Sequence, residues 1–186
     1  MYFTHRMTRI HVRAIIIVSL VLYFYFLGAE HVQAKYVLPY PALMPGNKLY
    51  SVMRFTDRLK GWWSWGSVAS VKYRLSLADK YLVEGKTLFE YEQYPLGLDA
   101  IRRSDENYAL VPNAITAAKR QGKDVTQLVR SYREASLEHA RVLERLLEAN
   151  PAEVIWRAEN EPERILPLAQ IVRQSQAIRR EGASYE

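Results

Sequence analysis

The sequence predicts an all-α fold, an antiparallel bundle of about four to five helices that follows an N-terminal apolar helix and an extended strap. Apolar residues recur in alternating steps of three and four along most of the chain, which is the spacing of one side of a helix. Turn residues interrupt this pattern at intervals that suit short connections between antiparallel helices. No segment combines a two-residue alternation with flanking turn signals, so we predict no β-sheet.

Residues 1–34 have the layout of an export signal, and we expect them to be either a cleaved signal peptide or a retained membrane anchor. A basic stretch at residues 5–13 precedes an uncharged run at residues 14–29, and Val32 and Ala34 then have the spacing that a signal peptidase recognises. The basic stretch should stay inside by the positive-inside bias. The rest of the chain is therefore expected outside the cytoplasm.

The length of the apolar run favours cleavage after Ala34. Its sixteen residues, rising ~1.5 Å each in a helix, span only ~24 Å, less than the ~30 Å hydrocarbon core. Against cleavage, the aromatic residues at positions 23–26 would suit the interface between membrane and water. Retention as an anchor therefore stays open, with the body of the protein outside the cytoplasm in both cases.

Composition argues against several classes of function. The chain has 26 Lys and Arg against 20 Asp and Glu, and this excess is spread along its length, so we expect no nucleic-acid partner. It has no cysteine, which excludes disulfide bonds and thiolate chemistry. His139 is the only histidine after residue 34, whereas a zinc site needs several His or Cys ligands. We therefore predict no bound metal and no cofactor.

Past the export segment the chain divides into a strap, a helical domain and a tail. Residues 35–46 contain three prolines, which favour an extended strap. Residues 47–181 are the expected bundle, and residues 182–186 are expected to be a disordered tail. The helices are expected to begin at the capping residues Asn47, Ser67 and Asp124, at Leu96, and at the Asn150–Pro151 pair.

The helix expected from Asp124 has the most regular apolar pattern, and His139 falls within it. A histidine at such a position is either a buried core residue with one hydrogen-bond partner or a pH switch or proton carrier, and the first interpretation is the more common. We therefore expect His139→Leu to be tolerated and His139→Glu to be strongly destabilising. The stripe is Val125, Leu128, Tyr132, Ala135, His139, Val142 and Leu146.

The strap reads YVLPYP at residues 36–41 and LMPGNKLY at residues 43–50. The helical domain contains LADK at residues 77–80, GKDV at residues 122–125 and ASLEH at residues 135–139. Together these segments resemble a family of bacterial exported proteins that is classed as a domain of unknown function. The resemblance implies export and a helical bundle, and it implies no catalytic residue.

Four residues stand where this resemblance implies good helix formers. They are Gly85, Pro112, Pro162 and Pro167. Glycine weakens a helix and proline lacks the N–H that a helix interior needs, so helix continuity is open at each position. Pro112 is expected to kink the helix that begins at Leu96 or to split it one turn earlier.

Four carboxylates could supply an acid and a base for glycoside cleavage: Asp105, Glu106, Glu134 and Glu138. Arginines and lysines are interleaved with them, which instead predicts solvated helix faces with i,i+4 ion pairs. We therefore expect that the protein is not an enzyme.

Three tryptophans and three basic residues form the strongest candidate for a contact surface. Indole rings beside cations suit the headgroup layer of a membrane that contains anionic lipids. The alternative, which we favour, is that the rings close the end of the bundle, where large side chains are needed. The residues are Trp62, Trp63, Trp65, Arg54, Arg58 and Lys60.

These observations predict a non-enzymatic, extracytoplasmic module that binds or scaffolds another component of the cell envelope. Its expected partner is an envelope protein or the membrane surface. A peripheral protein that contacts the membrane surface through residues 62–65 is the first alternative. A wall-active hydrolase is the second alternative.

Overall fold

The computed structural model describes residues 36–41, 44–45, 49–63, 66–157 and 162–185. The predicted export segment, residues 1–34, lies outside these residues, and so does the predicted cap Asn47. Within the described ranges, no helix combines the length and the apolar character that crossing a bilayer requires.

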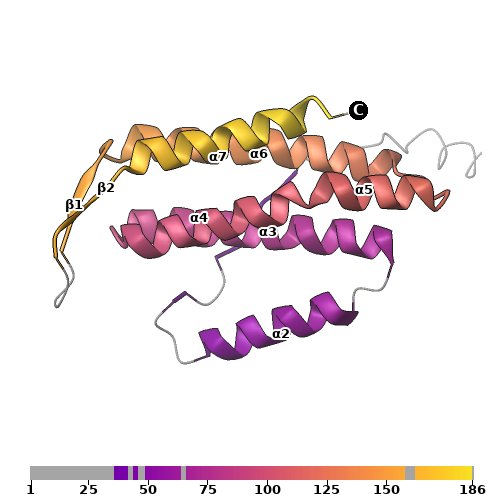
Figure 1. The fold of residues 1–186 in the computed structure, drawn as a ribbon, viewed down its shortest axis with the longest axis horizontal. Helices are drawn as coiled ribbons and strands as arrows, with labels where there is room; N and C mark the ends of the chain where they lie inside the picture. Colours follow the sequence, from indigo (N-terminus) through magenta and orange to yellow (C-terminus); the bar gives the residue numbers. More distant parts are fainter. Residues whose placement is uncertain (1–35, 42–43, 46–48, 64–65, 158–161, 186) are drawn as a thin grey trace, which may run out of the picture. The chain divides into compact units, whose positions relative to one another are not determined.

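Six helices and two short strands make up the described part of the chain (Figure 1). α4 and then α5 pack along α3, and α7 runs along α6. The mainly helical fold confirms the predicted helical class. The pair of short strands was not predicted. The elements are α2 (Tyr50–Trp63), α3 (Ser67–Glu90), α4 (Tyr94–Ala109), α5 (Val111–Arg120), α6 (Thr126–Ala149), β1 (Val154–Trp156), β2 (Arg164–Leu166) and α7 (Leu168–Ala183).

Pro112 splits the predicted third helix into α4 and α5, as expected. Leu110 separates the two helices. Pro112 lies in the first turn of α5, where backbone N–H groups have no partner within the helix, so the N–H that proline lacks is not needed. Gly122, with a φ of 69°, follows α5 and turns the chain toward α6.

Two glycines bring α3 and α4 into close contact. A Cβ on Gly85 would lie 2.9 Å from Ile101 Cγ1, and a Cβ on Gly97 would lie 2.6 Å from Phe89 Cδ2. α3 continues through Gly85 without a break. The residue that weakens the helix locally therefore allows α4 to approach it.

The prediction of a helix from the Asn150–Pro151 pair, with no sheet, is wrong. Asn150 takes an extended backbone conformation, and β1 and β2 then pair antiparallel about Ile155 and Ile165. Each strand has three residues, which is too short for an alternation to stand out in the sequence. Pro162 and Pro167 flank β2, so neither interrupts its hydrogen bonds, and both exclude a continuous helix.

α6 begins beside its predicted capping residue, whereas α3 does not use the one predicted for it. Asp124 Oδ1 accepts a hydrogen bond from the Thr126 N–H at 2.9 Å, so α6 begins close to the predicted position. Ser67 does not cap α3, contrary to the prediction, because its hydroxyl donates to Gln121 Oε1 at 2.7 Å. The chain enters α3 through Gly66, whose φ of 101° favours glycine.

Two apolar clusters form the core, and buried polar residues separate them along α3, α4 and α6. The first cluster includes Leu82, Ile101 and Leu143. The second includes Leu75, Tyr108, Ile115 and Tyr132. The predicted stripe on α6 agrees with the structure, since its residues from Leu128 to Leu146 are buried.

Candidate functional site

Polar side chains from four helices, all of them buried except the half-buried Asp105, meet between the two apolar clusters, and we call this group the central cluster. His139 and Arg179 are fully buried, and Asp79 is nearly so. The sequence singled out His139 but not its partners on the other helices. The members are Asp79 on α3, Ser104 and Asp105 on α4, His139 on α6, and Ser175 and Arg179 on α7.

His139 makes two hydrogen bonds rather than the one expected. Arg179 Nε donates to His139 Nδ1 at 3.1 Å, so the ring proton is on Nε2, which donates to Asp79 Oδ1 at 2.7 Å. Burial lowers the pKa of His139, although Asp79 opposes this effect. The ring is therefore neutral at pH 7. Replacement of His139 by leucine would leave Asp79 Oδ1 and Arg179 Nε buried without the hydrogen bonds that the ring makes. The expectation that leucine is tolerated is not supported by these contacts.

Arg179 connects α7 to α4 and fixes Asp105 inside the bundle. Its Nη2 donates to Ser104 Oγ at 2.9 Å and lies 2.8 Å from Asp105 Oδ1. Its guanidinium carbon lies 4.1 Å from the centre of the Tyr108 ring, within cation–π range. Burial raises the pKa of Asp105, and the positive charge of Arg179 opposes this rise. Ser175 Oγ donates to the second oxygen, Asp105 Oδ2, at 2.7 Å.

The four candidate carboxylates divide into two groups. Glu106, Glu134 and Glu138 pair with arginines on their own helices, which agrees with the predicted ion pairs within helices. Asp105 does not, and the prediction is wrong there because Asp105 turns inward to Arg179. Its neighbours in sequence gave no sign of this, since the partner is on α7.

The strap is attached to the central cluster through Tyr36. Its hydroxyl donates to Asp79 Oδ2 at 2.5 Å, and Leu38 packs against the first apolar cluster. Burial and the Asp79 carboxylate raise the pKa of the Tyr36 phenol, so it remains a donor at neutral pH. The cluster therefore joins the strap and four helices.

Tyr36→Phe is expected to lower the free energy of unfolding by about 1.5 kcal/mol, the scale for a hydrogen bond to a charged group. The matched control is Tyr40→Phe in the same strap, because Tyr40 is 95% exposed. Urea denaturation of the two variants measures the difference. If both variants lose the same stability, the hydroxyl of Tyr36 does not hold the strap.

Gly182 allows α7 to pack against a second polar contact. Tyr108 donates to Ser136 Oγ, and this hydroxyl donates to Tyr132 O at 2.6 Å. A Cβ on Gly182 would lie 1.8 Å from Tyr108 Oη and 2.6 Å from Ser136 Oγ. The end of α7 therefore has no room for a side chain at this position.

Gly182→Ala is expected to destabilise the protein by about 1–3 kcal/mol through overpacking, although alanine is the better helix former. Thermal and urea unfolding measure the change. Tyr108→Phe in the same chain removes the closest atom, so it should recover part of the loss caused by Gly182→Ala. A stabilising Gly182→Ala would show that α7 ends before this contact.

A different set of polar contacts holds α2 on α3. Asp57 forms an ion pair with Lys80, and Tyr50 Oη donates to Glu84 Oε1 at 2.6 Å. Arg103 Nη1 donates to Tyr50 Oη at 3.2 Å. Burial raises the pKa of Glu84, and burial together with Glu84 raises the pKa of Tyr50 to about 12. α2 is thus docked through its polar side.

The apolar side of α2 faces outward. Val52, Phe55 and Leu59 are 57%, 61% and 44% exposed. The sequence pattern alone indicated an amphipathic helix here without showing which side would be covered. We call these three residues the outer face of α2.

The predicted tryptophan surface can be located only in part. Arg54 is half-buried and Lys60 is exposed. α2 includes Trp62 and Trp63, but their side chains and that of Arg58 are not among those described, and Trp65 lies outside the described residues. The choice between a bundle plug and a membrane contact therefore stays a prediction for these rings.

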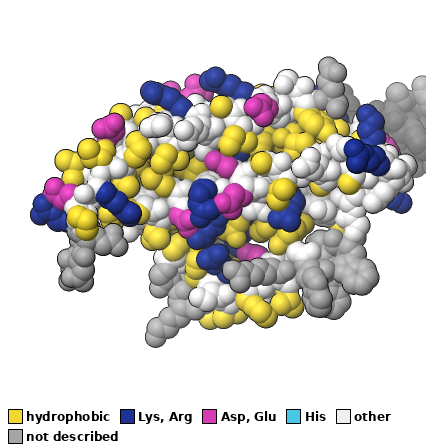
Figure 2. Space-filling view, viewed as in Figure 1, with side chains coloured by type: hydrophobic (Ala, Val, Ile, Leu, Met, Phe, Trp, Pro, Cys, Tyr) yellow, Lys and Arg dark blue, Asp and Glu magenta, His cyan; other side chains and the backbone are white. Residues whose placement is uncertain are grey.

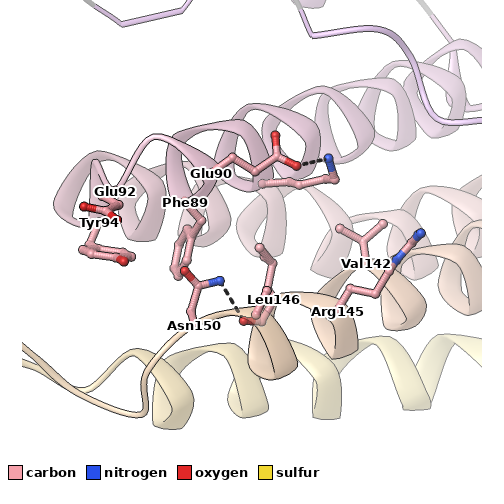
Figure 3. Close-up of a pocket in the computed structure, with 10 residues that line it drawn as sticks. Phe89, Glu90, Glu92, Tyr94, Val142, Arg145, Leu146 and Asn150 are labelled. Carbon is pink, nitrogen blue, oxygen red and sulfur yellow. Dashed lines mark hydrogen bonds and ion pairs between the residues drawn. The ribbon is translucent and has the colours of Figure 1, made fainter.

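An open groove of about 320 Å³ lies between the ends of α3, α4 and α6 (Figure 3). Phe89 from α3 and Leu146 from α6 lie toward each other in it, and Lys86 and Glu90 form an ion pair at its edge. The groove combines apolar and charged lining. The lining residues are Lys86, Phe89, Glu90, Glu92, Tyr94, Val142, Arg145, Leu146, Ala149 and Asn150.

Charges on the described surface are mixed. Figure 2 shows basic, acidic and hydrophobic side chains interspersed on one face, with no histidine visible, and His139 is buried. In the described ranges, no three His, Cys, Asp or Glu side chains gather as metal ligands.

The chain matches no protein-family model, no curated protein and no solved structure. The resemblance of the strap and helices to an exported family therefore stays a prediction.

Proposed function

We propose that the protein is a non-enzymatic helical module of the cell envelope that acts by binding another envelope component. The observation that supports this most is the closure of the central cluster. In the described part of the chain, His139 and Asp79 are the pair best suited to acid–base chemistry; both are buried and bonded to each other, and Arg179 donates to the other ring nitrogen of His139. A catalytic acid or base has to come within hydrogen-bond reach of its substrate.

The groove in Figure 3 offers a place for a partner to bind. Its apolar floor includes Phe89 and Leu146, and its edge has charges of both signs. A small concave site with apolar lining and a few polar groups is the usual form of a binding pocket. The predicted export places this groove outside the cytoplasm, where an envelope protein can reach it.

Site-specific photo-crosslinking in the native host tests the proposal. A photoreactive residue at Arg145, on the groove, should give one discrete adduct with another envelope protein. The matched control is Ala117, an exposed residue of α5 outside the groove, which should give none. Release of soluble fragments from purified cell wall by the protein would contradict the proposal and favour a hydrolase.

A further inference from the structure

We infer that α2 lies on the surface of an anionic lipid bilayer and inserts its outer face, Val52, Phe55 and Leu59, among the lipids. This inference rests on the envelope location in the proposed function. The outer face of α2 is separate from the groove, whose lining includes no residue of α2.

The orientation of α2 is the reverse of that expected for a helix in a soluble bundle, whose apolar stripe faces the core. At 3.6 residues per turn, Tyr50 and Asp57 lie within ~20° of each other around the helix axis, and the outer face lies ~140–200° away from them. Tyr50 and Asp57 hold the helix on α3. The apolar side therefore points away from the protein.

The docking contacts of α2 can persist when its outer face enters lipid, because they lie on the opposite side. Asp57 is the only acidic residue in α2, and it is paired with Lys80. α2 also contains Arg54, Arg58 and Lys60, so the helix has a net positive charge. An apolar side combined with basic residues is typical of helices that lie in the interface of anionic membranes.

The number of residues between the predicted membrane segment and Tyr36 limits how far apart the two can lie. Tyr36 contacts Asp79 and Asp57 contacts Lys80, so the start of the strap and the middle of α2 meet adjacent residues of α3. Seven steps along the chain separate Ala29, the last residue of the apolar run, from Tyr36, and at ~3.6 Å each they span at most ~25 Å. If the apolar run stays in the bilayer, this length allows the part of the protein that contains α2 to contact the same membrane.

Depth-dependent quenching in the full chain tests the inference. The chain has no cysteine, so Phe55→Cys can be labelled uniquely with an environment-sensitive fluorophore. The matched control is Ala177→Cys on α7, which is also exposed. Each labelled chain is reconstituted in vesicles of phosphatidylcholine and phosphatidylglycerol that contain nitroxide-labelled lipid, and circular dichroism checks that both variants are folded.

The label at position 55 should be quenched by the nitroxide lipid several-fold more than the label at position 177. Omitting phosphatidylglycerol or raising the salt concentration should reduce that quenching, because both weaken the attraction of the basic residues to lipid. Equal, weak quenching at the two positions would overturn the inference. Energy transfer between labelled chains, with no lipid quenching, would also overturn it and assign the outer face to a second copy.

Shielding of position 55 from both lipid and water would overturn the inference in a third way, because it would assign the outer face to residues 14–29 of the same chain. None of these results bears on crosslinking from Arg145 in the groove. The lipid contact and the proposed binding function can therefore fail independently.

Discussion

Arg179→Met is expected to lower the free energy of unfolding by about 3–5 kcal/mol, the scale for removing one partner of a buried ion pair. The methionine has a similar length but no donor, so the half-buried carboxylate of Asp105 would lose its cation. Ser104 and His139 would each lose a hydrogen bond from the same guanidinium. Urea denaturation followed by circular dichroism measures the loss.

Arg173→Met is the matched control for this variant, because Arg173 lies on the same helix and is exposed. It should change stability by less than about 0.5 kcal/mol, as surface substitutions usually do. Arg179→Met combined with Asp105→Leu should be more stable than Arg179→Met alone, since replacing both charges leaves no unpaired ion. Similar losses in Arg173→Met and Arg179→Met would show that Arg179 is not inside the bundle.

The α6 side of the central cluster could be predicted, because there the polar residue interrupts an apolar stripe. His139 lies among Tyr132, Ala135 and Val142 at the spacing of a buried helix side, and it is buried. Ser104 lies likewise in the stripe of α4 between Ile101 and Tyr108. A polar residue in such a stripe is a sign of a buried hydrogen-bond partner elsewhere.

The α7 side could not be predicted from apolar spacing. Its buried residues keep the alternating steps of four and three, but only the first two are apolar. They are Leu168, Val172, Ser175, Arg179 and Gly182. In a sequence, an arginine is usually assigned to the surface and a glycine to the end of a helix. Only the continued spacing of four and three residues past Val172 indicates that Arg179 and Gly182 are buried.

The orientation of α2 could not be predicted from its apolar stripe either, because that stripe faces outward. Its apolar stripe is clear in the sequence, and the rule that such a stripe faces the core would turn Phe55 inward. Side-chain contacts between residues distant in sequence instead place the polar side of α2 against α3, since Tyr50 bonds to Glu84 and Asp57 pairs with Lys80. Long-range pairs of this kind cannot be read from local periodicity.

His139→Leu is expected to lower the free energy of unfolding by on the order of 3 kcal/mol, because it leaves one oxygen of a buried carboxylate and one buried guanidinium N–H without a partner. Asp79 Oδ1 and Arg179 Nε are the two atoms concerned. The control is Leu137→Ala in the same helix, since Leu137 is half exposed. Urea denaturation at pH 7 compares the variants with the unmodified chain.

The same variant should also change how stability depends on pH. Folding lowers the pKa of His139, so the unfolded chain binds a proton more readily than the folded chain does. The stability that comes from the neutral ring is therefore complete above a pH of about 6.5 and decreases, by at most ~1.4 kcal/mol per pH unit, as the pH falls toward the lowered value. Asp105 and Glu84 act in the opposite direction, because burial raises their pKa values, but both are present in each chain. The difference in unfolding free energy between the unmodified chain and His139→Leu should thus shrink from pH 7 to pH 5, and a constant difference would show that His139 is accessible to protons in the folded protein.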